Sequence, residues 1–218
     1  MQPIIFSQVS EGKQLIAKYF PDFTEAQLNL LESYVNALLE TNKVINLISR
    51  KNQEEVWVNH ILHSLSIVKM VKFLPNQYVL DFGTGGGLPG IPLAIAFPET
   101  NFLLVDSIGK KVNAVEGIIQ RIGLKNVKTK HTRVEDLSMK FDYAVSRAVT
   151  SLSTMNDWVK GKLKKGIGGD VPNGLIYIKG GDFDQELQDL KRPYRIWEMS
   201  EWFEPEFFET KKVVWIDL

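Results

Sequence analysis

Cysteine is absent from the 218 residues of the chain, and only three histidines are present. Without cysteine there are no disulfide bonds, thiolate metal ligands or cysteine nucleophiles. Three histidines leave little material for a histidine metal site, so we expect no metal. No stretch of eighteen apolar residues occurs, which argues against a membrane-spanning helix. Residues 1–12 lack the basic segment and apolar run of a signal peptide. These absences predict a soluble, cytoplasmic protein that contacts no membrane.

An excess of charge is also missing, because 26 Lys and Arg residues balance 26 Asp and Glu residues. Overall neutrality argues mildly against a nucleic-acid partner, but the charge is unevenly distributed. The segment 105–165 holds 13 basic and 6 acidic residues, whereas 180–218 holds 5 basic and 10 acidic residues. A neutral chain can therefore carry a basic face. Such a face is either a contact surface for RNA phosphates or an ordinary solvated surface.

The first 75 residues favour helices. Thr24 and Gln27 form a capping-box pattern, and apolar residues recur at helical spacing from there to Thr41. The segment 43–50 is expected to be a loop. A second long helix is predicted over 54–74, where Pro75 stops it. We therefore expect residues 1–75 to form a helical N-terminal extension packed on the rest of the chain.

Beyond residue 75, short apolar runs alternate with helical segments. Strands are predicted at 78–80, 102–105, 127–131, 143–145, 175–178 and 213–216, and helices at 91–97, 110–122 and 152–163. The glycine-rich segment 164–173 is expected to be a loop. Continuous apolar strands alternating with helices are typical of βαβ units in a parallel sheet. The predicted fold class is α/β, with a doubly wound Rossmann-like sheet over residues 76–218.

A glycine-rich loop follows the first predicted strand, over residues 81–90, with the sequence DFGTGGGLPG. Glycines between a strand and a helix permit a tight turn and a close backbone approach to a ligand. One frame of this loop, Gly85, Gly87 and Gly90, matches the dinucleotide fingerprint. The other frame is led by Asp81 and continues through glycines 83, 85 and 87, as in S-adenosylmethionine-dependent methyltransferases.

The loop favours the methyl donor over a dinucleotide. A dinucleotide site needs free helix N–H groups for its phosphates. Pro89 removes one of these donors, and Asp81 adds a negative charge, which suits a cationic amino-acid group. A nicotinamide-dependent oxidoreductase remains the alternative.

Further candidate residues follow the other strands, because ligands of doubly wound sheets bind beyond the carboxyl ends of the strands. Asp106 ends the second strand, where its carboxylate can accept two ribose hydroxyls in either ligand class. Val134 can cover an adenine face, and Glu135 can meet the adenine amine. Arg147 follows the fourth strand and is expected to point toward cofactor and substrate. The alternatives are helix-start roles for Asp106, Val134 and Glu135 and a surface ion pair for Arg147.

Several motifs occur together in a fixed order: Asn46-Leu47-Ile48, His60-Ile61-Leu62 with Ser64-Leu65, the glycine loop extended through Leu93, Val105-Asp106-Ser107, Val134-Glu135 and Ser146-Arg147-Ala148. With these motifs the chain resembles the bacterial RsmG (GidB) family, the ribosomal small-subunit RNA guanine-N7 methyltransferases. The resemblance runs from about Phe23 to Lys179 and more weakly to the C-terminus. It implies a Rossmann-like methyltransferase core with a helical N-terminal extension.

The resemblance also implies S-adenosyl-L-methionine as methyl donor and 16S ribosomal RNA as substrate. In this family the cofactor is held by residues that match Gly83, Leu88, the Val134-Glu135 pair and Arg147. Two positions depart from the family pattern, because the family usually has Asp at His63 and often a basic residue at Asn59. His60 and His63 share one predicted helix, but no cysteine or third nearby histidine completes a metal site.

The residues available agree with methylation of guanine N7. The absence of cysteine excludes the ordinary covalent route to pyrimidine C5 methylation. The segment 146–149 lacks the Asp/Asn-Pro-Pro-aromatic sequence that is usual for amino-group methylation. Guanine N7 carries a lone pair and no proton, so the enzyme has to align the reactants and needs no general base. The alternatives are the oxidoreductase and a non-catalytic RNA-binding protein with this fold.

The predicted site therefore has no catalytic residue and no metal ligand. The residues expected to bind the cofactor are Gly83, Gly85, Leu88, Asp106, Val134, Glu135 and Arg147. The protein is expected to be a monomer that acts on 16S ribosomal RNA, either free or within the small subunit. A basic rim around the cofactor pocket is predicted from Lys110, Lys111, Lys160, Lys162, Lys164 and Lys165.

Overall fold

The computed structural model describes residues 3–49, 55–147, 151–166 and 168–217. Its centre is a seven-stranded sheet with the order β3-β2-β1-β4-β5-β7-β6. The strands are β1 (Tyr78–Phe82), β2 (Asn101–Asp106), β3 (Val127–His131), β4 (Tyr143–Arg147), β5 (Leu175–Gly180), β6 (Tyr194–Glu198) and β7 (Lys211–Ile216). Strands β1 to β5 pair in parallel, whereas β7 is antiparallel to both β5 and β6. The predicted α/β fold with a doubly wound sheet is confirmed.

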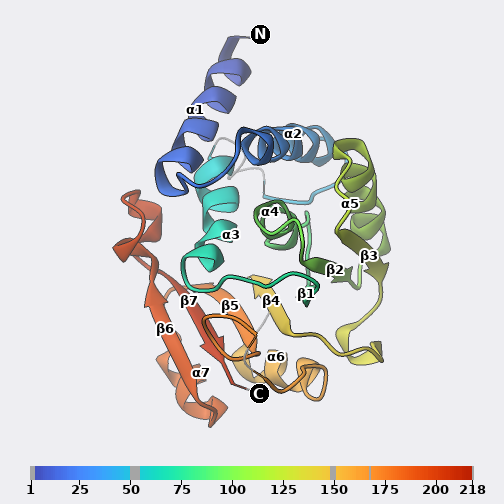
Figure 1. The fold of residues 1–218 in the computed structure, drawn as a ribbon, viewed down its shortest axis with the longest axis vertical. Coiled ribbons are helices and arrows are strands. Elements are labelled where there is room, and N and C mark those ends of the chain that lie inside the picture. Colours follow the sequence, from blue (N-terminus) through green and yellow to red (C-terminus); the bar gives the residue numbers. More distant parts are fainter. Residues whose placement is uncertain (1–2, 50–54, 148–150, 167, 218) are drawn as a thin grey trace.

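Helices cover both faces of the sheet (Figure 1). The helices are α1 (Pro3–Tyr19), α2 (Glu25–Asn42), α3 (His63–Leu65), α4 (Gly90–Ala96), α5 (Gly109–Ile122), α6 (Leu152–Val159) and α7 (Asp184–Leu190). One hydrophobic cluster contains buried apolar side chains of α2, α4 and α5, and a second cluster contains those of α6 and α7. The sheet therefore has a separate apolar core on each face. None of the helices among the described residues is long and apolar enough to cross a membrane.

The N-terminal helices share one core with the sheet. The larger cluster contains Tyr34 and Leu38 of α2 together with Val145 of β4 and Phe208 near the end of the chain. The Tyr34 hydroxyl also donates a 2.9 Å hydrogen bond to the carbonyl of Gly86. Helix α2 thus packs directly on the glycine loop. The division into an extension of residues 1–75 and a domain of residues 76–218 stays a prediction.

Most of the predicted elements are confirmed, and their local causes are visible. Helix α2 begins with the predicted capping box, in which the Thr24 hydroxyl accepts from the Gln27 N–H and the Gln27 side chain accepts from the Thr24 N–H. Helix α5 ends at Gly123, whose φ of +71° is the left-handed conformation expected at a helix C-terminus. The segment 43–49 is a loop, as predicted; residue 50 lies outside the described residues.

The predicted helix over 54–74 is wrong in its form and its end. Trp57–Leu62 is a π-helix, α3 adds one turn, and a 3₁₀ segment, Ser66–Lys69, ends the helical part. Residue 54 lies outside the described residues. From residue 71 to 74 the side chains are alternately buried and exposed, as in extended chain. The Phe73 ring packs 5.0 Å from the ring of Phe97, and this packing overrides the helical pattern.

Two further differences concern the second half of the chain. The helix predicted over 152–163 ends at Val159, and Gly161 turns the chain with a φ of +73°. Strand β6 and helix α7 were not predicted. Strand β6 is half exposed, and α7 buries only Leu187 and Leu190, so neither has a long apolar run in the sequence.

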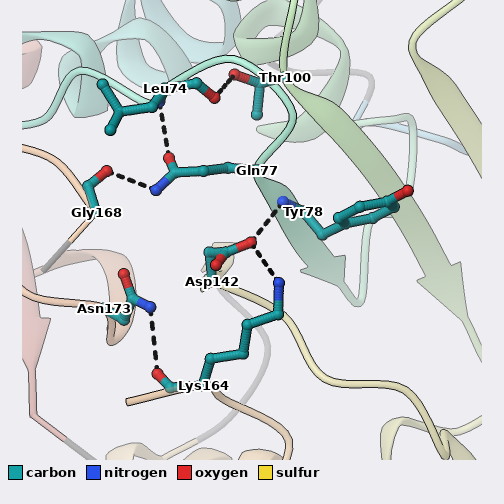
Figure 2. Close-up of polar contacts among 8 residues, drawn as sticks. All are labelled: Leu74, Gln77, Tyr78, Thr100, Asp142, Lys164, Gly168 and Asn173. Carbon is teal, nitrogen blue, oxygen red and sulfur yellow. Dashed lines mark hydrogen bonds and ion pairs between the residues drawn. The ribbon is translucent and has the colours of Figure 1, made fainter. Parts of the chain in front are cut away.

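Polar contacts fasten the loops at the amino ends of β1 and β4 (Figure 2). The carboxylate of Asp142 accepts 2.8 Å and 3.0 Å hydrogen bonds from the backbone N–H of Tyr78 and from Nζ of Lys164. The side chain of Gln77 accepts from the N–H of Leu74 at 2.7 Å and donates to the carbonyl of Gly168 at 2.5 Å. These contacts stabilise the end of the sheet opposite the glycine loop.

Candidate functional site

The glycine loop connects β1 to α4 at the carboxyl edge of the sheet. Gly85 and Gly87 have φ values of +57° and +93°, a backbone conformation that side chains other than glycine rarely adopt. The N–H of Gly85 donates a 3.0 Å hydrogen bond to Oδ2 of Asp106 at the end of β2. The loop is therefore held in one conformation by the neighbouring strand.

Asp81 lies beneath this loop and is fully buried. Its Oδ2 accepts hydrogen bonds from the Thr84 hydroxyl at 2.6 Å and from the Gly90 N–H at 2.9 Å. Burial raises the pKa of Asp81 to about 7, although the hydrogen bonds from Thr84 and Gly90 oppose this shift. This arrangement differs from the expectation that the Asp81 carboxylate faces a cationic group of the ligand. The carboxylate holds the loop, and Asp81 does not line either of the cavities described below.

A first cavity of about 430 Å³ opens beside β1, β2 and the segment after β3. Four of the residues predicted to bind the cofactor line it, namely Gly83, Asp106, Val134 and Glu135. Val134 is buried in a 3₁₀ turn, Val134–Asp136, and forms an apolar part of the wall. Trp158 of α6 also lines this cavity, and no signal in the sequence pointed to it.

Asp106 has two roles in this wall. Its Oδ1 accepts a 2.9 Å hydrogen bond from the N–H of Ile108, and its Oδ2 accepts from Gly85. Each carboxylate oxygen has two lone pairs, so both oxygens can accept a further hydrogen bond from a ligand hydroxyl. The bond to Ile108 lies just before α5 and does not cap a helical N–H group, and it leaves this capacity intact.

A second cavity of about 500 Å³ shares Gly83 with the first. The predicted residues Gly85, Leu88 and Arg147 line it. All seven predicted cofactor residues therefore line one of two adjoining cavities at the carboxyl ends of the strands. Both volumes fall within the usual range for ligand sites, about 300–1,000 Å³.

Arg147 ends β4 and donates a 3.1 Å hydrogen bond from Nη1 to the carbonyl of Asn59. Burial lowers the pKa of Arg147 to about 10, whereas the nearby Tyr34 and Asp81 act in the opposite direction. Within the described part of the chain, no carboxylate lies within 4 Å of the guanidinium. A surface ion pair is thus not the role of Arg147 here, and its charge is available to an anionic ligand group.

The helical segment before β1 supplies the opposite wall of the second cavity. Asn59, His60 and His63 line it, and all three are buried. Burial, followed by the charge of Arg147, lowers the pKa of His60 to about 3 and that of His63 well below its ordinary value. The sequence marked His60 as part of a family motif and Asn59 and His63 as departures from the family pattern, and it assigned none of them to the cofactor. No group of three or more His, Cys, Asp or Glu side chains arranged for a metal ion was found in the described ranges.

The predicted basic rim is only partly present. Lys111 lines the first cavity, and Lys110 next to it is exposed. The ammonium group of Lys162 is held by backbone hydrogen bonds, since its Nζ donates to the carbonyls of Glu135 and Leu137. Lys164 pairs with Asp142 at the amino end of β4, away from both cavities (Figure 2). The prediction that Lys164 belongs to the rim is therefore wrong.

Comparison with solved structures agrees with the fold. Magnesium protoporphyrin IX methyltransferase from Synechocystis PCC 6803, solved with bound S-adenosylmethionine, superposes with a TM-score of 0.59 at 15% identity, covering 95% of this chain and 97% of that one. An S-adenosylmethionine-dependent methyltransferase from Aquifex aeolicus gives a TM-score of 0.56 at 14% identity, covering 82% and 98% of the two chains. At these identities the similarity shows the fold alone.

Comparison of sequences shows the family. The family model described as rRNA small subunit methyltransferase G, GidB, matches residues 27–213. Proteins named ribosomal RNA small subunit methyltransferase G are 48% identical in Bacteroides thetaiotaomicron, over 93% of this chain and 98% of that protein, and 47% identical in Christiangramia forsetii, over 94% and 97%. The two cavities at the glycine loop thus occur in a chain that matches its relatives over nearly their full length. The chain belongs to the GidB family of rRNA small subunit methyltransferases.

Proposed function

We propose that this protein transfers the methyl group of S-adenosyl-L-methionine to N7 of a guanine in 16S ribosomal RNA. Family membership supports an S-adenosylmethionine-dependent methyltransferase that acts on small-subunit ribosomal RNA. The observation that carries the proposal is a pair of cavities that both have Gly83 in their walls. An elongated donor molecule that passes Gly83 can place its adenosine in one cavity and its amino-acid end in the other.

The first cavity suits the adenosine end of the donor. The free lone pairs of Asp106 can accept the two ribose hydroxyls, and the buried side chain of Val134 offers an apolar face for the adenine. Glu135 lies next in the same turn, where it can meet the adenine amine. We therefore assign Asp106, Val134 and Glu135 to recognition of the adenosine.

The second cavity suits the amino-acid end and the reacting methyl group. Arg147 provides a buried positive charge for the donor's carboxylate, because charge-assisted hydrogen bonds of this kind are strong. The backbone at Gly83 and Gly85, together with Leu88, forms the wall beside it. We assign these four residues to the donor as well.

S-adenosylmethionine supplies an electrophilic methyl group bound to a positively charged sulfur. Guanine N7 has an in-plane lone pair and no proton, so the protein needs no general base at this step. The side chains of both cavities have to align the two reactants and exclude water, and alignment alone is worth about 7–11 kcal/mol. His60 and His63, whose pKa values are lowered by burial, stay neutral near pH 7 and add no positive charge beside the sulfonium.

The test is methyl transfer from tritiated S-adenosylmethionine to 16S ribosomal RNA, offered both free and within small subunits. Borohydride–aniline cleavage at the labelled nucleotide supports N7 of guanine as the acceptor. Label without cleavage would contradict N7, and failure to bind the donor in calorimetry would favour a non-catalytic RNA-binding protein. An absorbance change with a nicotinamide cofactor would favour the oxidoreductase instead. A monomeric enzyme in the cytoplasm is part of the same proposal, and sedimentation tests the monomer.

A further inference from the structure

Four buried polar atoms of one helical segment have no hydrogen-bond partner among the residues that the structure describes. They are Oδ1 of Asn59, Nδ1 and Nε2 of His60, and Nε2 of His63. The three residues are 6%, 6% and 7% exposed, and all of them line the second cavity. Buried polar atoms in folded proteins nearly always have a partner. Unpartnered atoms beside a cavity therefore indicate where a polar ligand forms hydrogen bonds.

The local backbone explains why these side chains gather on one wall. Asn59 and His60 belong to the π-helix Trp57–Leu62, and His63 follows directly in α3. Asn59 and His63 are four residues apart, so they lie on the same face of the helical segment. Short π-helical turns are frequent at functional sites. Gly85 and Leu88, which also line the cavity, belong to the glycine loop and not to this helical segment.

Contacts outside the cavity fix the orientation of two of these side chains. Nδ2 of Asn59 donates a 2.8 Å hydrogen bond to Oε2 of Glu55, which leaves Oδ1 as the amide atom without a partner. His63 has a backbone hydrogen bond with Asn59, one that favours the protonated ring. In the tautomer with the ring proton on Nδ1, the unpartnered Nε2 of the neutral ring is an acceptor. Asn59 and His63 thus offer two acceptors, and neutral His60 offers one donor and one acceptor.

We propose that Asn59, His60 and His63 form the subsite that holds the target guanine by its Watson–Crick edge, a proposal that rests on the proposed function. Guanine presents two neighbouring donors on this edge, N1–H and the 2-amino group, and one acceptor, O6. The two acceptors of Asn59 and His63 match the donors, and the N–H of His60 matches O6. Adenine presents a lone pair at N1, which would face an acceptor. With this edge held by the helix, N7 on the other ring stays free for the methyl group.

Two further residues at the same cavity suit the face of the base and the phosphate of an RNA nucleotide. Phe207 lines the cavity and packs edge-on against His63, with ring centroids 5.1 Å apart. An unstacked RNA base commonly stacks on such an aromatic ring. Nζ of Lys211 lies 4.7 Å from the ring centroid of Phe207, which places a positive charge near the base for a phosphate.

The experiment measures the binding of mononucleotides to the full chain saturated with S-adenosylhomocysteine, which fills the first cavity and the part of the second cavity beside Arg147. GMP, IMP and AMP are titrated by calorimetry. We expect GMP to bind at least fivefold more tightly than IMP, which lacks only the 2-amino group, and than AMP. The absence of saturable GMP binding, or AMP binding as tightly as GMP, would overturn the proposal.

Two variants connect this preference to the named side chains. His63→Phe keeps an aromatic ring against Phe207 and removes the acceptor, and Asn59→Ala removes the other acceptor. One of the two acceptors pairs with the 2-amino group, and in the variant that lacks it the ratio of GMP to IMP affinity should fall at least threefold while the IMP affinity changes little. The other acceptor pairs with N1–H, which IMP also carries, so in the variant that lacks it the affinities for GMP and IMP should fall together by at least threefold. Asn36→Ala, an asparagine exposed on α2, is the matched control and should keep the ratio. A purely structural role for Asn59 and His63 predicts an unchanged ratio of GMP to IMP affinity in both variants, and that result would refute the subsite.

The two proposals fail in different ways. Normal binding of S-adenosylhomocysteine and normal methyl transfer without a GMP preference would refute only the guanine subsite. A protein that binds neither S-adenosylmethionine nor S-adenosylhomocysteine would refute the proposed function itself.

Discussion

Replacing Gly85 with valine separates the ligand role of the glycine loop from its contribution to stability. Gly85 lines the second cavity and has a φ of +57°. A Cβ placed there has as its nearest neighbour the carbonyl oxygen of Leu47, at 3.7 Å, an ordinary contact distance. The fold therefore has space for a side chain at this position. The cost to the fold comes from the backbone conformation, and the cost to the ligand comes from filling the cavity.

The expected loss of stability follows from the backbone conformation alone. A β-branched residue held at a positive φ costs about 1–3 kcal/mol. For a chain of this length each kcal/mol lowers the melting temperature by about 2–4 °C. Gly123 provides a matched control, since its φ is +71° and a Cβ on this residue would meet no described atom within 4 Å. Gly123→Val at the end of α5 should lower the melting temperature by a similar amount.

Calorimetry with S-adenosylmethionine distinguishes the two variants. Gly85→Val should weaken donor binding at least tenfold, because its side chain occupies space that the donor needs. Gly123→Val should bind the donor as tightly as the wild-type protein. Unchanged affinity in Gly85→Val would refute the assignment of the loop. Equal losses in both variants would show that general destabilisation, and not the cavity, controls binding.

Three further predictions follow from the site and its surroundings. Arg147→Ala should lower methyl transfer at least tenfold, equivalent to about 1.4 kcal/mol, in single-turnover assays, and wild-type rates would disprove its role. Because the pKa of Asp81 is raised to about 7, the protonated side chain adds stability below about pH 4, and this stability is lost as pH rises through about 7. As pH rises over this range, the free energy of unfolding of the wild-type protein should therefore fall relative to that of Asp81→Asn. Parallel pH profiles of the two free energies would contradict this. Lys164→Glu should lower the melting temperature through repulsion with Asp142 and leave the salt dependence of RNA binding unchanged. Lys110→Glu should instead reduce the slope of the logarithm of RNA affinity against the logarithm of salt concentration by about 1. The reverse pattern would show that Lys164 belongs to the rim.

The sequence predicted those parts of the fold in which one local rule dominates. Strands β1, β2 and β4 are buried on both faces, so they appear as continuous apolar runs. Helix α5 has regular amphipathic spacing and a glycine at its end. Strand β6 has neither signal, because it lies at the sheet edge and is half exposed along its whole length.

The site was predictable where residues follow strand ends and not where packing brings in distant segments. Asp106 and Arg147 end β2 and β4, so topology alone places them near the glycine loop. Asn59 lines the same cavity because it lies on a π-helix, and no periodicity in the sequence predicted that helix. Lys164 was misplaced because the count of charge along the chain does not say which end of the sheet a loop occupies.

The strand order of the sheet has a consequence for how the protein is made. Strand β7 is synthesised after β6 but lies between β5 and β6, and β6 pairs with β7 alone in the described sheet. During translation the first five strands can pair as they emerge, whereas β6 has no docking edge until β7 is in place. Residues 194–198 therefore leave the ribosome as an unpaired strand, which is the kind of segment that associates with other chains. During that interval the charges of Arg195 and Glu198 oppose the association of this strand with other chains.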